Sequence, residues 1–448
     1  MKQKPAGSRP ATFPRRFFIK TSAGLAAAAG LPKWFLDQTE VHAATKELGP
    51  NDQPAVALIG CGGQGRGDAK NASKFGRIVA VCDVDDKNLA EGKKMFPDAK
   101  EYKDFRKVME QPDIHAIVCG TVDHWHTLVS MAAMRSGKDV YCEKPLTLCI
   151  DEGKNLVKTV HDTKRILQVG SQQRSDRRFR LACELVRNGR IGKLQHIDVW
   201  LPSGPRRGPF ASRPVPPGLN WDFWLGQTPA LDYVPERCHA NFRYWWEYSG
   251  GTMTDWGAHH NDIALWGAGL DRSGPVSVEG KELAPMIPGG FTASADYEVK
   301  FTYENGVTQS TRSTDGDTPY GGVAAKDRQR NGVKFHGSDG WIWVTRGDIQ
   351  ASKDGILEEK LPSNATRLYE SGDHMQNFFD CIRSRKQPIC EAEIGHRSAT
   401  VCHLGVIAIR IGRKLQWDPK KEQFVNDSEA NHWIKRPMRK GYGYDFIA

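Results

Sequence analysis

Residues 56–65 read VALIGCGGQG, a run of apolar residues that breaks into glycine. Gly60, Gly62 and Gly65 stand at the G-x-G-x-x-G spacing, which is typical of the first strand–helix turn of a dinucleotide-binding unit. Gly60 lets the chain turn sharply off the strand, and Gly62 lets backbone N–H groups approach a pyrophosphate. Gly65 lets the following helix pack close to the strand, with its positive N-terminal end directed at the phosphates.

A second segment supports this interpretation. Residues 80–85 read AVCDVD, an apolar run that ends in Asp83, 18 residues after Gly65. A carboxylate there can accept hydrogen bonds from both ribose hydroxyls and repels a 2′-phosphate, which favours NAD over NADP. A nucleotide-free strand–turn–helix is the alternative. The predicted cofactor contacts are Gly60, Gly62, Gly63, Gln64, Gly65, Asp83, His126, Glu143 and Lys144.

The composition is that of a soluble globular protein: 448 residues, of which 26% are charged and 39% hydrophobic. No apolar run reaches about 18 residues, so neither a membrane-spanning helix nor a stable membrane anchor is expected. Half of the net charge of +10 lies in residues 1–43, where seven Lys/Arg stand against two Asp/Glu. The other basic residues are dispersed, so nucleic-acid binding has little support. The ten cysteines form no C-x-x-C pair and are predicted to be buried small hydrophobes rather than a disulfide framework.

The N-terminus has the features of an export signal. The segment 15–20, RRFFIK, precedes the weakly apolar stretch TSAGLAAAAGL and the small-residue site Val41-His42-Ala43. This order is that of a twin-arginine signal, so residues 1–43 are predicted to be removed after Ala43 or Ala44. The prediction makes the twin-arginine export machinery a partner, and the periplasm or another exported location the destination. A basic N-terminal arm is the alternative.

Three parts follow the signal. Residues 44–53 form a polar linker. Residues 54–173 alternate short apolar strands with helices, the pattern of a parallel sheet with helices on both faces, and form the predicted Rossmann domain. Residues 174–448 form a predicted α/β domain, in which neighbouring strands without intervening helices indicate a large open, mainly antiparallel sheet. The predicted fold class is therefore α/β.

The expected elements have these bounds. In the first domain, strands are predicted at 54–60, 77–83, 114–120, 138–142 and 166–170, and helices at 65–75, 86–95, 103–110, 124–136 and 151–164. In the second domain, strands are predicted at 193–201, 276–283, 293–303, 307–313, 331–337 and 340–345, and helices at 176–188, 372–384 and 394–413, followed by an irregular tail. Glu304-Asn305-Gly306 indicates a hairpin turn.

Two stretches carry residues suited to acid–base chemistry. Strand 138–142 runs into Glu143-Lys144-Pro145, which places Lys144 at the carboxyl end of a central strand, beside the expected nicotinamide. A partly desolvated lysine can exchange a proton with a substrate hydroxyl, although a surface lysine is the alternative. Residues 250–262 read GGTMTDWGAHHND. A helix there would place Asp255 and His259 on one face, as a general base oriented by a carboxylate.

Further polar and aromatic residues are assigned as follows. His260 is given a structural role, and a metal site from His259, His260 and Asp262 is a minor alternative, so no metal is predicted. His126 is assigned to the nicotinamide pocket, with structural and metal-binding roles as alternatives. Ring faces can pack on sugar C–H groups, and a guanidinium can bind a hydroxyl or carboxylate. The predicted substrate contacts are therefore Arg243, Trp245 and His259, with core packing as the alternative for the aromatic ring.

The motifs GCGGQG, VCDVD, TVDHWH, YCEKPL and GGTMTDWGAHHND occur in this order. In this combination, the sequence resembles the glucose–fructose oxidoreductase / inositol dehydrogenase family over nearly all of the chain after the signal. The resemblance implies a Rossmann domain followed by an α/β domain whose open sheet often forms an oligomer interface, and hence a homo-oligomer such as a dimer or tetramer. It implies that Lys144, Asp255 and His259 are the catalytic residues. Val122 departs from the many members that have proline there, without removing any chemical group.

These observations favour an NAD-dependent oxidoreductase acting on a hydroxyl of a sugar, polyol or glycoside. In this hypothesis His259, supported by Asp255, removes the hydroxyl proton, and Lys144 donates a hydrogen bond to the developing alkoxide. An exported enzyme meets no expected pool of free NAD, so the cofactor should stay tightly bound and be regenerated in place. A redox-neutral glycosidase or lyase with a 3-keto-sugar intermediate satisfies the same constraint. A non-catalytic sugar-binding protein that retains NAD is the third hypothesis.

Overall fold

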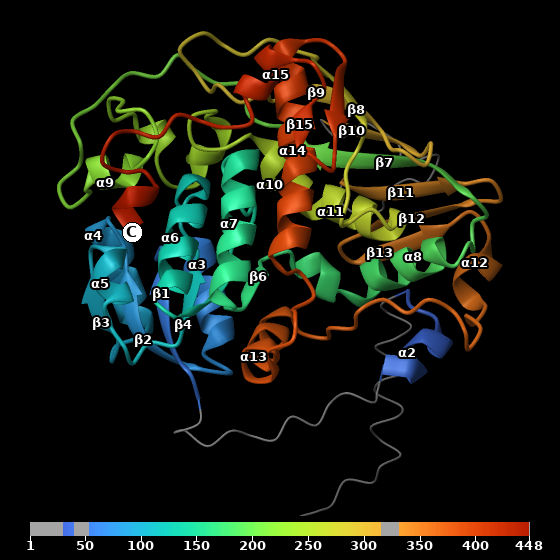
Figure 1. Cartoon of the computed structure of the whole chain (residues 1–448), viewed down its shortest axis with the longest axis horizontal. Coiled ribbons are helices and arrows are strands. Elements are labelled where there is room, and N and C mark those ends of the chain that lie inside the picture. Colours follow the sequence, from blue (N-terminus) through green and yellow to red (C-terminus); the bar gives the residue numbers. More distant parts are fainter. Residues whose placement is uncertain (1–29, 40–52, 315–330, 448) are drawn as a thin grey trace, which may run out of the picture.

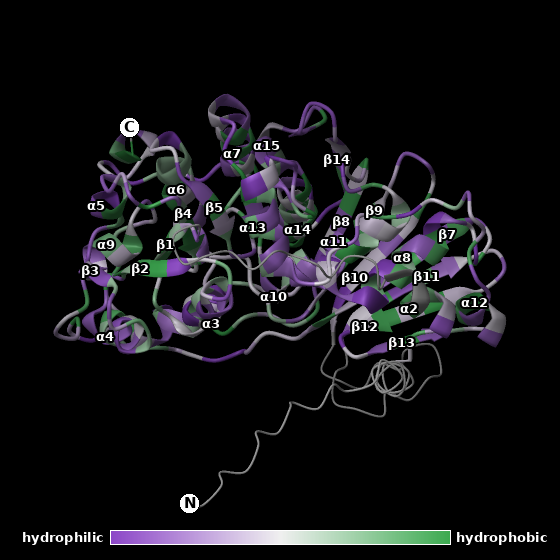
Figure 2. Cartoon of the chain, turned by 90° about the horizontal axis from the view of Figure 1, so that it is seen from below, coloured by the Kyte–Doolittle hydropathy of each residue, from purple (hydrophilic) through white to green (hydrophobic). Residues whose placement is uncertain are grey.

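The computed structural model describes residues 30–39, 53–314 and 331–447. Two sheets lie at opposite ends of the molecule, and helices α7 (Ile150–Thr163) and α14 (Ala392–Ile411) pass between them (Figure 1). Seen from below, the smaller sheet with its helices again occupies one end and the larger sheet the other (Figure 2). No helix in the described ranges is long and apolar enough to cross a membrane. All ten cysteines are buried free thiols, which agrees with the predicted burial.

The first sheet has six parallel strands in the order β3-β2-β1-β4-β5-β6. All five residues of β1 are buried, as expected of a central strand with helices on both faces. The predicted parallel sheet is therefore confirmed. Only β3 was not predicted, because its three residues, Lys-Glu-Tyr, show no apolar pattern. The strands are β1 (Ala55–Ile59), β2 (Arg77–Cys82), β3 (Lys100–Tyr102), β4 (Ala116–Cys119), β5 (Asp139–Cys142) and β6 (Leu167–Val169).

The helices of this domain overlap the predicted ones, and α3, α4, α5 and α6 begin within four residues of the preceding strand. The side chains of Asp85 and Asp104 accept hydrogen bonds from backbone amides two residues on, and so cap α4 and α5. These caps place each helix start beside the carboxyl end of a strand, where ligands bind in such sheets. The helices are α3 (Gly63–Ala72), α4 (Asp86–Met95), α5 (Phe105–Met109), α6 (Asp123–Arg135) and α7.

The second sheet has nine strands in the order β13-β12-β11-β7-β10-β9-β8-β14-β15. Among the described pairs, β7 and β10 run parallel and the others antiparallel, which confirms the predicted mainly antiparallel sheet. The strands are β7 (Leu194–Pro202), β8 (Ser277–Glu282), β9 (Tyr297–Thr302), β10 (Thr308–Thr314), β11 (Gly332–Gly337), β12 (Trp341–Thr345), β13 (Asp348–Ala351), β14 (Leu415–Asp418) and β15 (Gln423–Phe424).

The tail after α14 was predicted to be irregular, and this prediction is wrong. It contains β14, β15 and the short helix α15 (Ser428–His432). β14 adds to the edge of the sheet by pairing with β8, more than 130 residues earlier in the chain. Such short strands depend on a distant partner strand, so a local sequence pattern does not reveal them.

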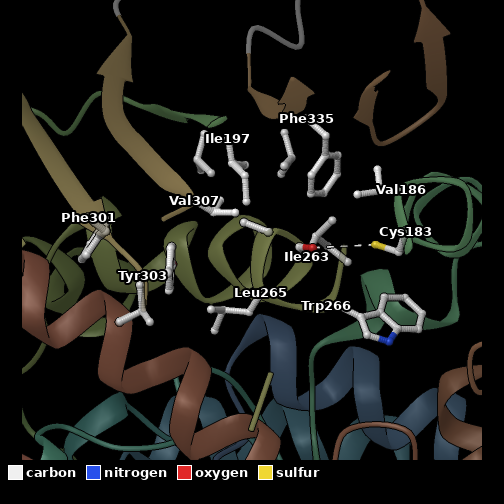
Figure 3. Close-up of a cluster of buried hydrophobic side chains, with 14 of the residues drawn as sticks. Cys183, Val186, Ile197, Ile263, Leu265, Trp266, Phe301, Tyr303, Val307 and Phe335 are labelled. Carbon is white, nitrogen blue, oxygen red and sulfur yellow. Dashed lines mark hydrogen bonds between the residues drawn. The ribbon is translucent and has the colours of Figure 1, made fainter. Parts of the chain in front are cut away.

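The main core lies between one face of the nine-stranded sheet and three helices: α8 (Arg177–Arg187), α11 (Gly257–Ala268) and α14. Figure 3 shows Ile197 and Phe335 of the sheet packed against Ile263 of α11 and Val186 of α8. The Cys183 thiol adds a contact of 3.7 Å to the Ile263 carbonyl oxygen. This packing fixes α11, which carries His259, relative to the sheet.

The C-terminal part of the chain also completes the nucleotide-binding domain. Phe378 and Phe379 of α13 (His374–Ser384) are buried in a cluster with Val56 and Val118 of the parallel sheet. A single boundary at residue 173 therefore does not separate the two domains, because α13 lies in the C-terminal part of the chain but packs on the first domain.

A short helix, α2 (Lys33–Thr39), lies beneath α8 and α12 (Asp354–Glu358) (Figure 1). Phe35 is 1% exposed, and the Arg180 guanidinium lies 4.6 Å from its ring centroid. Trp34 Nε1 donates a hydrogen bond of 3.0 Å to the Leu357 carbonyl oxygen. This helix falls inside the segment predicted to be removed as a signal. The paired arginines, the cleavage site and residues 44–52 of the linker lie outside the described residues.

Candidate functional site

The glycine turn after β1 has the geometry expected for phosphate binding. Gly60 has a φ of +89°, and a Cβ on Gly65 would lie 2.0 Å from the Gly60 carbonyl oxygen, so α3 packs directly against the turn. Gly62 caps α3, and a Cβ on it would meet no protein atom within 4 Å. The cleft side of the turn is therefore open, and an anion can reach the amides at the start of α3.

The carboxylate of Asp83 lies at the end of β2 and lines the same cleft. Its Oδ2 accepts a hydrogen bond from the Cys61 amide at 2.7 Å, and its Oδ1 accepts one from the Asp85 amide at 2.9 Å. Burial raises the pKa of Asp83 to about 6, although the two amides oppose this rise. Each oxygen keeps a further lone pair for a ribose hydroxyl. The open turn and this carboxylate together fit NAD.

Segments of the second domain form the other wall of the cleft. The Asn220 amide donates a hydrogen bond of 3.0 Å to the Val84 carbonyl oxygen, and His239 Nε2 lies 3.2 Å from Asp85 Oδ2. The predicted cofactor residues Gly63, Gln64, Glu143 and Lys144 all line the cleft from the first domain. The second domain contributes Phe223, Trp224, His239, Ala240, Phe242 and Arg243.

His126 lines this cleft, but its ring is occupied by the protein itself. Nδ1 lies 2.7 Å from the Pro145 carbonyl oxygen, and Nε2 lies 3.2 Å from that of Thr121. The ring therefore ties the loop after β4 to the loop after β5. It shapes the predicted nicotinamide region, and contact with the cofactor itself stays a prediction.

Lys144, Asp255 and Arg243 meet between the two domains. Lys144 Nζ donates to Asp255 Oδ1 at 2.5 Å, and Arg243 Nε donates to the same oxygen at 3.2 Å. Burial would raise the pKa of Asp255, but the charges of Lys144 and Arg243 hold it below its usual value. Asp255 is therefore an anion that fixes the lysine side chain.

The predicted pairing of Asp255 with His259 is not observed. Asp255 ends α10 (Thr252–Asp255), Trp256 joins this helix to α11, and the carboxylate contacts Lys144 instead. His259 is 5% exposed, and its enclosed Nδ1 has no hydrogen-bond partner in the described structure. Burial, then the charges of Lys144 and Arg346, hold the pKa of His259 well below its usual value, so the ring is neutral.

The other members of the histidine motif have structural roles. His260 Nε2 lies 2.8 Å from Asn331 Oδ1, in agreement with its assigned role. Asp262 forms a buried ion pair with Arg174, whose Nε donates to Oδ2 at 2.7 Å. Within the described ranges, no three His, Cys, Asp or Glu residues are grouped to hold a metal ion.

A pair of buried carboxyl groups lies beside Lys144. Glu143 Oε1 accepts a hydrogen bond of 2.9 Å from Gln172 Nε2, and burial raises the pKa of Glu143 against the effect of Lys144. Burial and then Glu143 raise the pKa of Asp68, on α3, to about 9. The raised pKa favours the protonated form of Asp68. It was not predicted, because an acid on an otherwise ordinary helix carries no local signal.

Trp245 was predicted to contact substrate, and this prediction is wrong. Its side chain is 2% exposed and lines neither cavity. Its Nε1 donates a hydrogen bond of 2.7 Å to the Glu236 carbonyl oxygen, and the Arg237 guanidinium lies 3.9 Å from its ring centroid. The ring belongs to an aromatic cluster with Phe291 and Tyr248, so its apolar surface is used in packing.

A second cavity adjoins the cofactor cleft and contains His259. Its volume of about 630 Å³ is in the usual range for small-molecule sites. Gln64, Glu143, Lys144 and Arg243 line both cavities, so the two cavities are adjacent at these side chains. The lining residues that sequence reasoning missed are Gln172, Gln173, Asp176, Phe179, Trp256 and Arg346.

Comparisons with known proteins agree with this architecture. Residues 55–171 match the model of the oxidoreductase family, NAD-binding Rossmann fold, and residues 206–444 match the model of the oxidoreductase family, C-terminal alpha/beta domain. A myo-inositol 2-dehydrogenase of Thermotoga maritima is 31% identical over 37% of this chain and 47% of its own length. A glycosyl hydrolase family 109 protein 2 of Shewanella sp. strain ANA-3 is 28% identical over 42% of this chain and 45% of its own. The matched regions thus span about half the length of these relatives.

The fold is also that of solved structures. The WlbA dehydrogenase from Bordetella pertussis, in complex with NADH and UDP-GlcNAcA, is similar with a TM-score of 0.61. The match covers 82% of this chain and 99% of that one, at 17% sequence identity. At this identity, the likeness concerns the fold alone.

Proposed function

The chain belongs to the oxidoreductase family of these two models, with an NAD-binding Rossmann domain and a C-terminal α/β domain, and on that premise we propose that it oxidises a hydroxyl group of a sugar, polyol or glycoside with NAD. One observation carries the proposal: Lys144 lines both the cofactor cleft and the cavity that contains His259. A substrate in that cavity can therefore place its carbinol carbon beside the cofactor while its hydroxyl meets Lys144 and His259.

In the proposed reaction, the substrate hydroxyl lies between Lys144 and His259. Nδ1 of His259 is enclosed, so the neutral ring accepts the hydroxyl proton at Nε2. Lys144 is held by Asp255 and donates a hydrogen bond to the oxygen as negative charge develops there. Bound NAD supplies the hydride acceptor. The walls that both domains contribute to the cleft limit the access of water to the reacting atoms.

The cofactor stays bound through the catalytic cycle in this proposal. The Asn220 and His239 contacts hold the second domain across the cleft, so release requires these contacts to open. Retention suits an exported protein, and we propose export through the twin-arginine pathway on the basis of the N-terminal sequence. Assembly through the open nine-stranded sheet, as a dimer or tetramer, is part of the same proposal, and light scattering of the purified protein tests it.

A redox-neutral glycosidase is the second candidate. The 28% identity to a glycosyl hydrolase family 109 protein favours it. In that reaction the same residues would take the C3 hydroxyl proton while the C3 hydride passes to bound NAD, and the hydride would return to C3 after elimination of the glycosidic group and addition of water. The two candidates share the first proton and hydride transfer and differ in the net product.

The experiment begins with the purified protein without added NAD. Denaturation should release NAD into the supernatant, and its absence would contradict cofactor retention. Incubation with inositols, sugars and nitrophenyl glycosides then separates the candidates. Lasting absorbance at the NADH band supports a dehydrogenase, and aglycone release without it supports the glycosidase. Lys144→Ala should abolish either activity while NAD remains bound, and retained turnover would remove the lysine from the mechanism.

A further inference from the structure

Some of the charged side chains that line the substrate cavity have an ion-pair partner and one does not. Asp255 binds both Lys144 and Arg243 through Oδ1. Asp176 caps α8 by accepting a hydrogen bond of 2.8 Å from the Arg178 amide. Glu143 is buried and has a raised pKa. In the part of the chain that the structure describes, one lining cation, Arg346, has no directly bonded ion-pair partner, although the charges of Asp255, Asp176 and Glu143 act on it.

Arg346 lies on the turn between β12 and β13 and reaches the cavity from the edge of the large sheet. Its guanidinium carbon lies 4.8 Å from the ring centroid of Trp256, which lies between Asp255 and α11. Stacking on an aromatic face holds a guanidinium in place while leaving its N–H donors free. Its charge also acts on His259, where it helps to lower the pKa of the imidazole.

Gln173 supplies a second unsatisfied group in the same cavity. Its side chain is 3% exposed, and both Oε1 and Nε2 are enclosed without a hydrogen-bond partner among the described residues. A buried amide that makes no hydrogen bond is destabilising, and such groups are usually satisfied by a ligand or water. The cavity therefore offers the substrate a guanidinium without a direct ion-pair partner, and the unused Gln173 amide becomes available when its side chain turns toward the cavity.

We propose that the natural substrate carries a carboxylate, as in a uronic acid or a glycoside of one, and that Arg346 and Gln173 bind it. The proposal rests on the proposed function and deepens it by naming the substrate class. A guanidinium pairs with a carboxylate through two parallel N–H···O bonds, and the Gln173 amide can donate a further one. A carboxylate also gives Arg346 a directly bonded anionic partner, which a neutral sugar cannot supply.

Matched substrate pairs test this with the full-length, NAD-loaded protein. D-Glucose is compared with D-glucuronate and glucose 6-phosphate, and D-galactose with D-galacturonate and galactose 6-phosphate. A single round of reduction of the bound cofactor gives the rate constant of hydride transfer at saturation and the half-saturating concentration, which serve as kcat and KM, and calorimetry gives the affinity. We expect the uronate to exceed its neutral partner in kcat/KM by roughly 10- to 100-fold. Arg346→Gln should remove this preference through KM, with kcat changed by less than about threefold.

Two further variants test the role of the guanidinium and serve as a control. Arg346→Lys keeps the charge but loses the paired bonds, so it should recover part of the preference. Arg383→Gln removes an arginine that pairs with Asp380 on the exposed side of α13 and should change nothing. Equal use of uronate and neutral sugar by the wild-type protein would overturn the proposal. So would an equal loss for both in Arg346→Gln, or a preference for the 6-phosphates over the uronates.

The calorimetric arm separates failure of this inference from failure of the proposed function. If no sugar reduces the cofactor, the oxidoreductase proposal fails, but uronate binding that is lost in Arg346→Gln still supports the carboxylate site. If neutral sugars reduce the cofactor and no uronate binds, the oxidoreductase proposal stands and the carboxylate site is rejected.

Discussion

Asp255→Asn should slow the reaction by loosening Lys144 rather than by changing the base. The substitution keeps the side chain's size but removes the negative charge that Lys144 and Arg243 share, at 2.5 and 3.2 Å. Removing one partner of a fully buried pair costs about 3–5 kcal/mol. The Lys144 and Asp255 side chains retain 12% and 17% exposure, so we expect a loss of about 2–3 kcal/mol of unfolding free energy.

The kinetic effect follows from the position of the lysine. A reacting group displaced by about 1 Å can cost on the order of 100-fold in rate, and we expect a fall of that size in kcat. Loss of the Asp255 charge leaves the cations around His259 less compensated, so the pKa of His259 falls further and the base stays neutral. The acidic limb of the pH–rate profile should therefore not move to higher pH.

The assay compares wild type, Asp255→Asn and the control Asp427→Asn, whose carboxylate pairs with Arg413 near the surface. Urea denaturation gives stability, and NAD content after denaturation gives cofactor occupancy. A single round of reduction of bound NAD by a saturating polyol gives the rate constant of hydride transfer, which serves as kcat. A folded, NAD-loaded Asp255→Asn protein with kcat within about threefold of wild type would refute the reasoning that Asp255 positions the lysine.

Three other predictions concern the cofactor turn, acid stability and the N-terminal helix. Gly62→Ala should leave the unfolding temperature unchanged, because its Cβ meets no protein atom within 4 Å, but it should weaken NAD binding at least about tenfold by calorimetry. Gly65→Ala should instead destabilise the fold. Equal effects of the two substitutions on stability and on NAD binding would contradict this assignment. Burial lowers the pKa of His260 and His374 from 6.5 to about 4, so the unfolded chain binds more protons as pH falls through that window. The burial of each neutral histidine should then lower the free energy of unfolding by up to about 3 kcal/mol at pH 4. A urea midpoint that stays constant from pH 7 to 4.5 would contradict this prediction. A chain starting at residue 44 should be less stable than one starting at residue 30 by about 2–3 kcal/mol, because it loses the buried Phe35 ring; equal melting temperatures would show that α2 contributes nothing.

Much of the architecture could be predicted from local patterns. The alternation of apolar strands and helices and the glycine turn are short-range features, and both domains show them as expected. Elements without such a pattern were missed, such as β3, with its polar residues, and the edge strand β14. The position of the Trp245 side chain could not be predicted either, because the sequence does not distinguish an aromatic ring that lines a cavity from one that packs in a core.

The amino-acid sequence by itself determined the cofactor turn, the acidic end of β2 and the placement of Lys144 after a central strand, because these depend on neighbouring residues and on backbone geometry. Only the tertiary structure decided which groups face one another. It pairs Asp255 with Lys144, 111 residues away, rather than with His259 four positions along the chain. It also brings Arg346 from the distant edge of a sheet into the substrate cavity. Packing between the domains determines such contacts, so the local periodicity of the sequence does not predict them.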